Sequence, residues 1–94
     1  MSRMIEWDDA KDAANYRKHG VRFEDAARVF DDPLAVSEQD RIENGEQRWR
    51  TLGMAGGCVL LLVAHTVKIG DAEVIRIISA RRTDRKERNR HEHG

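Results

Sequence analysis

The sequence has little of several residue types, and each shortage narrows what the protein can be. Cys58 is the single cysteine among 94 residues, so no internal disulfide can form. No apolar run approaches the roughly 20 residues of a membrane-spanning helix. The first ten residues, MSRMIEWDDA, lack the apolar segment of a secretory signal peptide. We therefore expect a protein of the reducing cytoplasm with no membrane partner, in which Cys58 is a buried, unreactive thiol.

The sequence also lacks an excess of charge of one sign, because 17 Lys and Arg balance 17 Asp and Glu. The balance hides a separation along the chain: residues 1–47 hold 12 acidic and 7 basic side chains, whereas residues 48–94 hold 5 and 10. Such a distribution predicts a basic face for an anionic partner, with nucleic acid as the main candidate. The alternative is that the two halves interleave in space and no basic face exists.

The first half of the chain predicts a strand and two helices. Residues 4–8 alternate between apolar and polar side chains, which is typical of a short strand. Residues 8–20 predict a helix that an aspartate caps at its start and that Gly20 ends in the left-handed conformation. Apolar side chains recur at helical spacing in residues 21–33, so we expect a second, amphipathic helix there.

The second half predicts strands joined by tight turns, among them a turn at Asn44-Gly45. The candidate strands are residues 34–38, 48–54, 58–67 and 74–81. Short links favour antiparallel pairing. We therefore expect an α+β fold with an antiparallel sheet of about four strands, the two N-terminal helices packed on it, and a polar C-terminal helix over residues 84–93.

Long stretches of the sequence resemble the BrnT toxin family. The opening IEWDDAKDAANYRKHGVRFEDAARVFDDPLA is similar to the start of that family, RIISARRTDRKER is similar to its end, and the strand block RWRTLGM…CVLLLVAHT has its spacing. The resemblance covers nearly the whole chain and implies a single domain over residues 1–94. It implies a RelE-like fold and a small ribonuclease that acts as a type II toxin.

The resemblance also implies partners. A BrnA-type antitoxin, a ribbon-helix-helix DNA-binding protein, would neutralise the toxin, and the chain would reach operator DNA only through it. The toxin would cleave RNA without a metal ion or cofactor and so inhibit translation and growth. Two positions depart from the family pattern: His91 replaces a tail aromatic, which concerns catalysis, and Arg22 replaces a helix-capping Ser or Thr, which concerns stability. The rival interpretation is a non-catalytic RNA-binding or co-repressor subunit of a toxin–antitoxin complex.

Metal-free RNA cleavage needs a base for the 2′-hydroxyl, cations for the charged transition state and an acid for the leaving oxygen. By analogy with RelE-like enzymes, Arg50, Arg76 and Arg81 are candidate catalytic residues, because a guanidinium fits phosphate oxygens. Arg76 interrupts an apolar strand, so it must reach a cleft or pair internally, and an ion pair with a helix carboxylate is its alternative role. Further candidates for RNA binding are Arg82, Lys18, His19, Ser79 and Arg85. Surface or capping roles are the alternatives for these residues.

His65 and His91 are candidate proton-transfer residues, because imidazole titrates near neutral pH. His65 alternates with apolar residues of a strand, where a hydrogen-bonded core histidine is the alternative role. His91 lies in the polar tail, where a solvated side chain is the alternative. Although His91 and His93 flank Glu92, they do not form the H-E-x-x-H zinc motif, and we predict no metal site.

Overall fold

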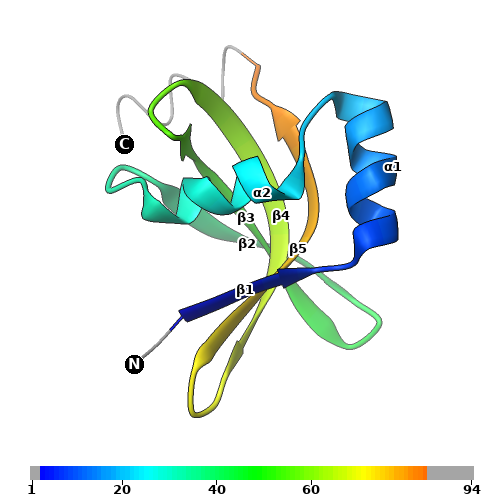
Figure 1. The fold of residues 1–94 in the computed structure, drawn as a ribbon. Coiled ribbons are helices and arrows are strands. Elements are labelled where there is room, and N and C mark those ends of the chain that lie inside the picture. The colour runs from blue at the N-terminus through cyan, green and yellow to red at the C-terminus, as the bar shows by residue number, and fades with distance from the viewer. Residues whose placement is uncertain (1–2, 85–94) are drawn as a thin grey trace.

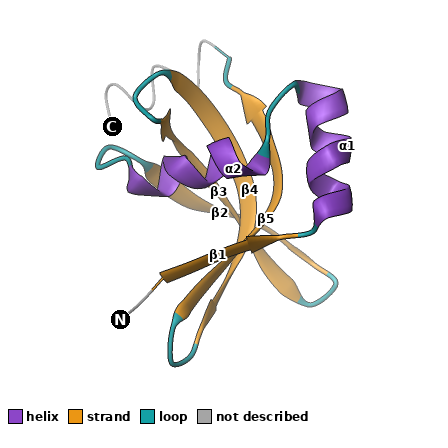
Figure 2. Ribbon diagram, viewed as in Figure 1, coloured by secondary structure: helices purple, strands orange, loops and turns teal. Residues whose placement is uncertain are grey.

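The computed structural model describes residues 3–84, which form a five-stranded sheet with helices packed against it (Figures 1 and 2). The strands are β1 (Arg3–Trp7), β2 (Val36–Glu43), β3 (Glu46–Ala55), β4 (Val59–Ile69) and β5 (Glu73–Arg82). The helices are α1 (Asp9–His19), α2 (Phe23–Ala26) and a 3₁₀ helix, η1 (Ala27–Asp31). No helix in this part of the chain is long and apolar enough to cross a membrane.

The order of strands in the sheet is β1-β5-β4-β3-β2. Strands β2 to β5 form the expected antiparallel meander, and its first turn is Asn44-Gly45, with φ of 52° and 79°. The expectation of about four antiparallel strands was wrong in one respect, because β1 adds a fifth strand that runs parallel to β5. Parallel pairing is possible here because β1 and β5 are not joined by a turn: the helices and three strands lie between them in the chain.

Helix α1 has the predicted bounds and caps. The Asp8 carboxylate accepts hydrogen bonds from the backbone N–H groups of Ala10 and Lys11 at 2.8 and 3.2 Å, and Gly20 ends the helix with φ of 71°. Arg22 makes no side-chain cap for α2. The Asp12 carboxylate instead accepts the N–H of Phe23 at 2.8 Å, so α1 stabilises the start of α2 where a capping Ser or Thr is missing.

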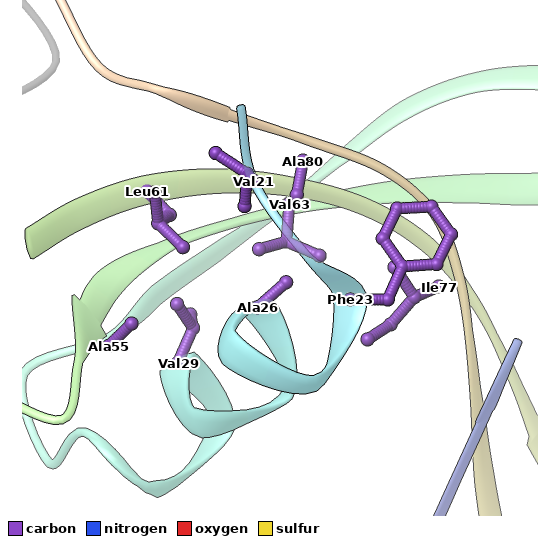
Figure 3. Close-up of a cluster of buried hydrophobic side chains, with 9 residues drawn as sticks. All are labelled: Val21, Phe23, Ala26, Val29, Ala55, Leu61, Val63, Ile77 and Ala80. Atoms are coloured by element: carbon purple, nitrogen blue, oxygen red, sulfur yellow. The ribbon is translucent and has the colours of Figure 1, made fainter. Parts of the chain in front are cut away.

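The second predicted helix is shorter and less regular than its apolar spacing suggested, because four α-helical residues are followed by the 3₁₀ turn η1. The predicted apolar face is confirmed. Figure 3 shows these helices packed on β3, β4 and β5 around nine core side chains. They are Val21, Phe23, Ala26, Val29, Ala55, Leu61, Val63, Ile77 and Ala80, each no more than 5% exposed. Trp7 packs edge-on against Phe23 with 6.4 Å between ring centroids, which extends the core to β1.

Two further expectations concern Cys58 and residues 84–93. Cys58 was predicted to be buried and is exposed, because it lies in the β3–β4 turn, just before β4 begins. The predicted polar helix over residues 84–93 lies outside the described residues, apart from Asp84, which is not helical.

Candidate functional site

Strand alternation gives the sheet two chemically different faces. One face carries the core. The other, which we call the second face, carries polar side chains from all five strands: Glu6, Glu38, Arg48, Arg50, Thr66, Lys68, Arg76, Ser79 and Arg81. The register places Arg76 between Glu6 of β1 and Thr66 of β4, and it places Arg50 between Glu38 of β2 and Ala64 of β4. All three candidate catalytic arginines, Arg50, Arg76 and Arg81, thus lie on the same face. Arg50 and Arg76 are on strands separated by one other strand.

These arginines pair with glutamates of neighbouring strands. Arg50 Nη2 lies 3.1 Å from Glu38 Oε1, and Arg76 Nη1 lies 3.6 Å from Glu6 Oε1. The carboxylate that pairs with Arg76 therefore comes from a strand and not from a helix. The ion pair is in contact with solvent, since the Arg76 side chain is 45% exposed. Exposed ion pairs of this kind contribute about 1 kcal/mol or less. A phosphate group can therefore compete with the glutamates for both guanidinium groups.

The ion pairs also decide between the two interpretations of the charge distribution. Glu6 and Glu38 come from the acidic half of the chain, and Arg76 and Arg50 come from the basic half. The Arg3–Glu73 pair, at 2.9 Å, also joins the halves, but here the arginine comes from the acidic half and the glutamate from the basic half. Within residues 3–84 the halves interleave, so the predicted basic face is a mixed face on which arginine and glutamate side chains lie side by side.

A hollow of about 240 Å³ on the second face collects charged side chains from four strands. Its lining residues are Glu6, Glu46, Thr66, Lys68, Val74 and Arg76. Thr66 is only 5% exposed, whereas Lys68 and Arg76 are exposed. The hollow places cations beside carboxylates, which is the combination that phosphodiester chemistry uses. Sequence reasoning identified only Arg76 here, although the alternation of β4 already puts Thr66 and Lys68 on one side.

The register separates the two arginines at the end of β5. Arg81 lies opposite Leu62 on the second face, and Arg82 lies opposite the core residue Leu61 on the other face. Arg81 is five residues beyond Arg76, roughly 16 Å along the strand, so the two cannot bind the same phosphate oxygen. Ser79 lies between them on the second face, opposite Ala64.

His65 lies in the core, on the helix-covered side of β4. It is 3% exposed, its ring meets that of Phe30 edge-on at 4.9 Å, and Nε2 hydrogen-bonds Thr51 Oγ1 at 2.7 Å. Thr51 in turn hydrogen-bonds Ser37 at 2.7 Å. Burial lowers the pKa of His65 and favours its neutral form. These contacts agree with the core-histidine interpretation and separate His65 from the second face.

Lys18 and His19 are not among the residues that line the hollow. Lys18 and His19 are in the last turn of α1, where cations suit the helix dipole. Arg85 and His91 lie outside the described residues. Within residues 3–84, no three His, Cys, Asp or Glu side chains are grouped as a metal site would need.

Two comparisons with known proteins point to the same family. A family model described as "Ribonuclease toxin, BrnT, of type II toxin-antitoxin system" matches residues 7–87. The crystal structure of the Brucella abortus ribonuclease toxin BrnT is similar with a TM-score of 0.60, covering 90% of this chain and 100% of that one. The two chains are 21% identical, so this likeness concerns the fold. No curated protein gives a significant match.

Proposed function

Because this chain belongs to the BrnT family of ribonuclease toxins of type II toxin–antitoxin systems, we propose that it is an endoribonuclease that needs no metal ion. In this proposal residues 1–94 act as one toxin domain. Its RNA site lies on the open face of the sheet, as in RelE-like enzymes. The observation that carries the site is the arrangement of Arg50 and Arg76 on one sheet face, each in a weak, exposed ion pair with a glutamate.

The proposed reaction is attack of a ribose 2′-hydroxyl on the adjacent phosphate. Charge grows on the phosphate oxygens as the new bond forms, and guanidinium groups stabilise it with paired hydrogen bonds. Arg76, in the hollow, would contact the reacting phosphate. Arg50 and Arg81 are too far along the sheet to share that phosphate and would hold its neighbours in the same RNA strand. RNA binding would then replace the glutamate partners by phosphates.

The family implies an antitoxin. We propose that it is a BrnA-type ribbon-helix-helix protein that covers the second face in the cytoplasm and that links the complex to operator DNA. Cleavage of RNA by free toxin would inhibit translation and stop growth.

A second candidate function is a non-catalytic subunit that binds RNA or assists repression by the antitoxin. The observation that favours it is the pairing of Arg50 and Arg76 with glutamates, which reduces the positive potential of the second face. Growth separates the two functions, since a subunit without activity does not arrest cells.

The test is induction of the chain in a bacterial host without antitoxin. We expect growth arrest with the wild-type chain, normal growth with Arg76→Ala, and rescue of the wild type by a co-expressed BrnA-type protein. The matched control is Glu73→Gln, which breaks the Arg3–Glu73 pair between the same two strands but on the opposite face. Normal growth despite abundant, folded wild-type protein would overturn the proposal.

A further inference from the structure

The hollow on the second face contains more than a phosphate clamp, because an arginine is flanked by a carboxylate and an amine from different strands. We propose that Glu6 is the general base and Lys68 the general acid of RNA cleavage, with the scissile phosphate bound between them at Arg76. This inference rests on the ribonuclease function proposed above and assigns the proton transfers of that reaction.

The order of the strands supports this assignment. Glu6 is on β1 and Lys68 is on β4. Strand β5, which carries Arg76, lies between these two strands. Two strand spacings, roughly 10 Å, therefore separate the strands that carry Glu6 and Lys68. Along the strands Lys68 is offset from Arg76 by two residues, since it lies opposite Val74. Both side chains line the same hollow, from strands on either side of β5. A phosphate bound at Arg76 would have the base on one side and the acid on the other, as an in-line displacement requires.

Glu6 is the better base of the two carboxylates in the hollow. It lies directly opposite Arg76 in the β1–β5 register, and its Oε1 is 3.6 Å from the guanidinium, which places the carboxylate next to the phosphate that Arg76 would bind. Glu46 is at the first residue of β3, beside the Asn44-Gly45 turn. The Glu6 side chain is 52% exposed, so a ribose hydroxyl has access to it.

Thr66 forms the floor of the hollow. It lies opposite Arg76 in the β4–β5 register and is 5% exposed, so the small side chain sits beneath the charged groups. Lys68 follows two residues later on the same side of β4, where it remains exposed. A larger side chain at position 66 would fill the space that the phosphate needs.

The step balances without another reactant. The Glu6 carboxylate accepts the 2′-hydroxyl proton while the 2′-oxygen forms a bond to phosphorus. The bond from phosphorus to the 5′-oxygen breaks, and the Lys68 ammonium protonates that oxygen. The products are a 2′,3′-cyclic phosphate and a 5′-hydroxyl end. Water then carries the proton from Glu6 back to Lys68, which restores the enzyme.

The test is single-turnover cleavage of an end-labelled RNA by the full chain and by Glu6→Gln, Lys68→Gln and the control Glu73→Gln. We expect each of the first two variants to cleave about 100-fold more slowly or worse. Both should bind a 2′-deoxy analogue of the substrate within about threefold of the wild type, because binding does not need proton transfer. Glu73→Gln should cleave at the wild-type rate.

The pH profile distinguishes proton transfer from a structural role. The wild-type rate should fall at low pH as the base is protonated and at high pH as the acid loses its proton. Glu6→Gln should lose the low-pH fall and Lys68→Gln the high-pH fall. Wild-type rates in both variants would overturn this assignment and leave the ribonuclease function intact, whereas an inactive wild-type chain would overturn both.

Discussion

The Asn15 side chain completes the edge of β5 by bonding to both backbone polar groups of Ala80. Its amide nitrogen donates to the Ala80 carbonyl at 2.9 Å, and its oxygen accepts the Ala80 N–H at 3.1 Å. The pairing of β1 with β5 ends at Ile77, so α1 supplies a partner for Ala80 beyond the end of that pairing. This contact ties α1 to the strand that carries Arg76 and Arg81.

Replacement of Asn15 should therefore weaken the whole fold. Asn15→Ala leaves the buried carbonyls of Val21 and Ala80 and the Ala80 N–H without this partner. We expect the free energy of unfolding to fall by about 3 kcal/mol, since each unsatisfied buried group costs about 1–3 kcal/mol. Urea denaturation measures the loss, with the exposed α1 variant Arg17→Ala as control. Equal midpoints for the two variants would contradict this role of Asn15.

Gly53 of β3 lies close against Val29 of η1. A Cβ at this position would lie 2.8 Å from Val29 Cγ1 and 3.2 Å from Ala35 Cβ. Gly53→Ala should destabilise the fold by about 2 kcal/mol, because a packed core resists added volume. Combination with Val29→Ala, which removes the closest atom, should recover about 1 kcal/mol relative to the sum of the single changes. Strictly additive losses in denaturation would show that the two positions do not clash.

His65 should make stability depend on pH. Burial lowers its pKa in the folded chain, so the unfolded chain takes up the proton first as pH falls below about 6.5. The contribution of His65 to the free energy of unfolding is fully present above that pH and is lost progressively below it. Denaturation at about pH 7.5 and about pH 5.5 should show a larger loss for the wild type than for His65→Gln. The same loss in both proteins would exclude His65 as its source.

Arg81 and Arg82 are neighbours in sequence on opposite faces of the sheet, which makes them a matched pair. Arg81→Ala should cleave RNA about tenfold more slowly than the wild type, because it loses a charge-assisted contact on the second face. Arg82→Ala should remain within about threefold of the wild type, because its side chain faces away from the proposed RNA path. Larger damage from Arg82→Ala, at equal stability, would place the RNA on the other face.

Features that depend on local sequence were predictable. A few consecutive residues determine each of these features: the caps of α1, the Asn44-Gly45 turn, and the alternation that puts His65 with the core. The parallel pairing of β1 with β5 was not, because it joins Arg3 to Glu73 and no turn signals the contact. The same long-range pairing brings Glu6 beside Arg76, which is why the sequence indicated the arginine but not the glutamate.

The most direct test of the ribonuclease account is cleavage of a labelled RNA by the purified, antitoxin-free chain in the presence of EDTA, with Arg76→Ala measured alongside. The account predicts that the wild type cleaves despite the chelator and that the variant, equally folded, does not. Cleavage abolished by EDTA would contradict the metal-free mechanism. Full cleavage by Arg76→Ala would contradict the site on the second face.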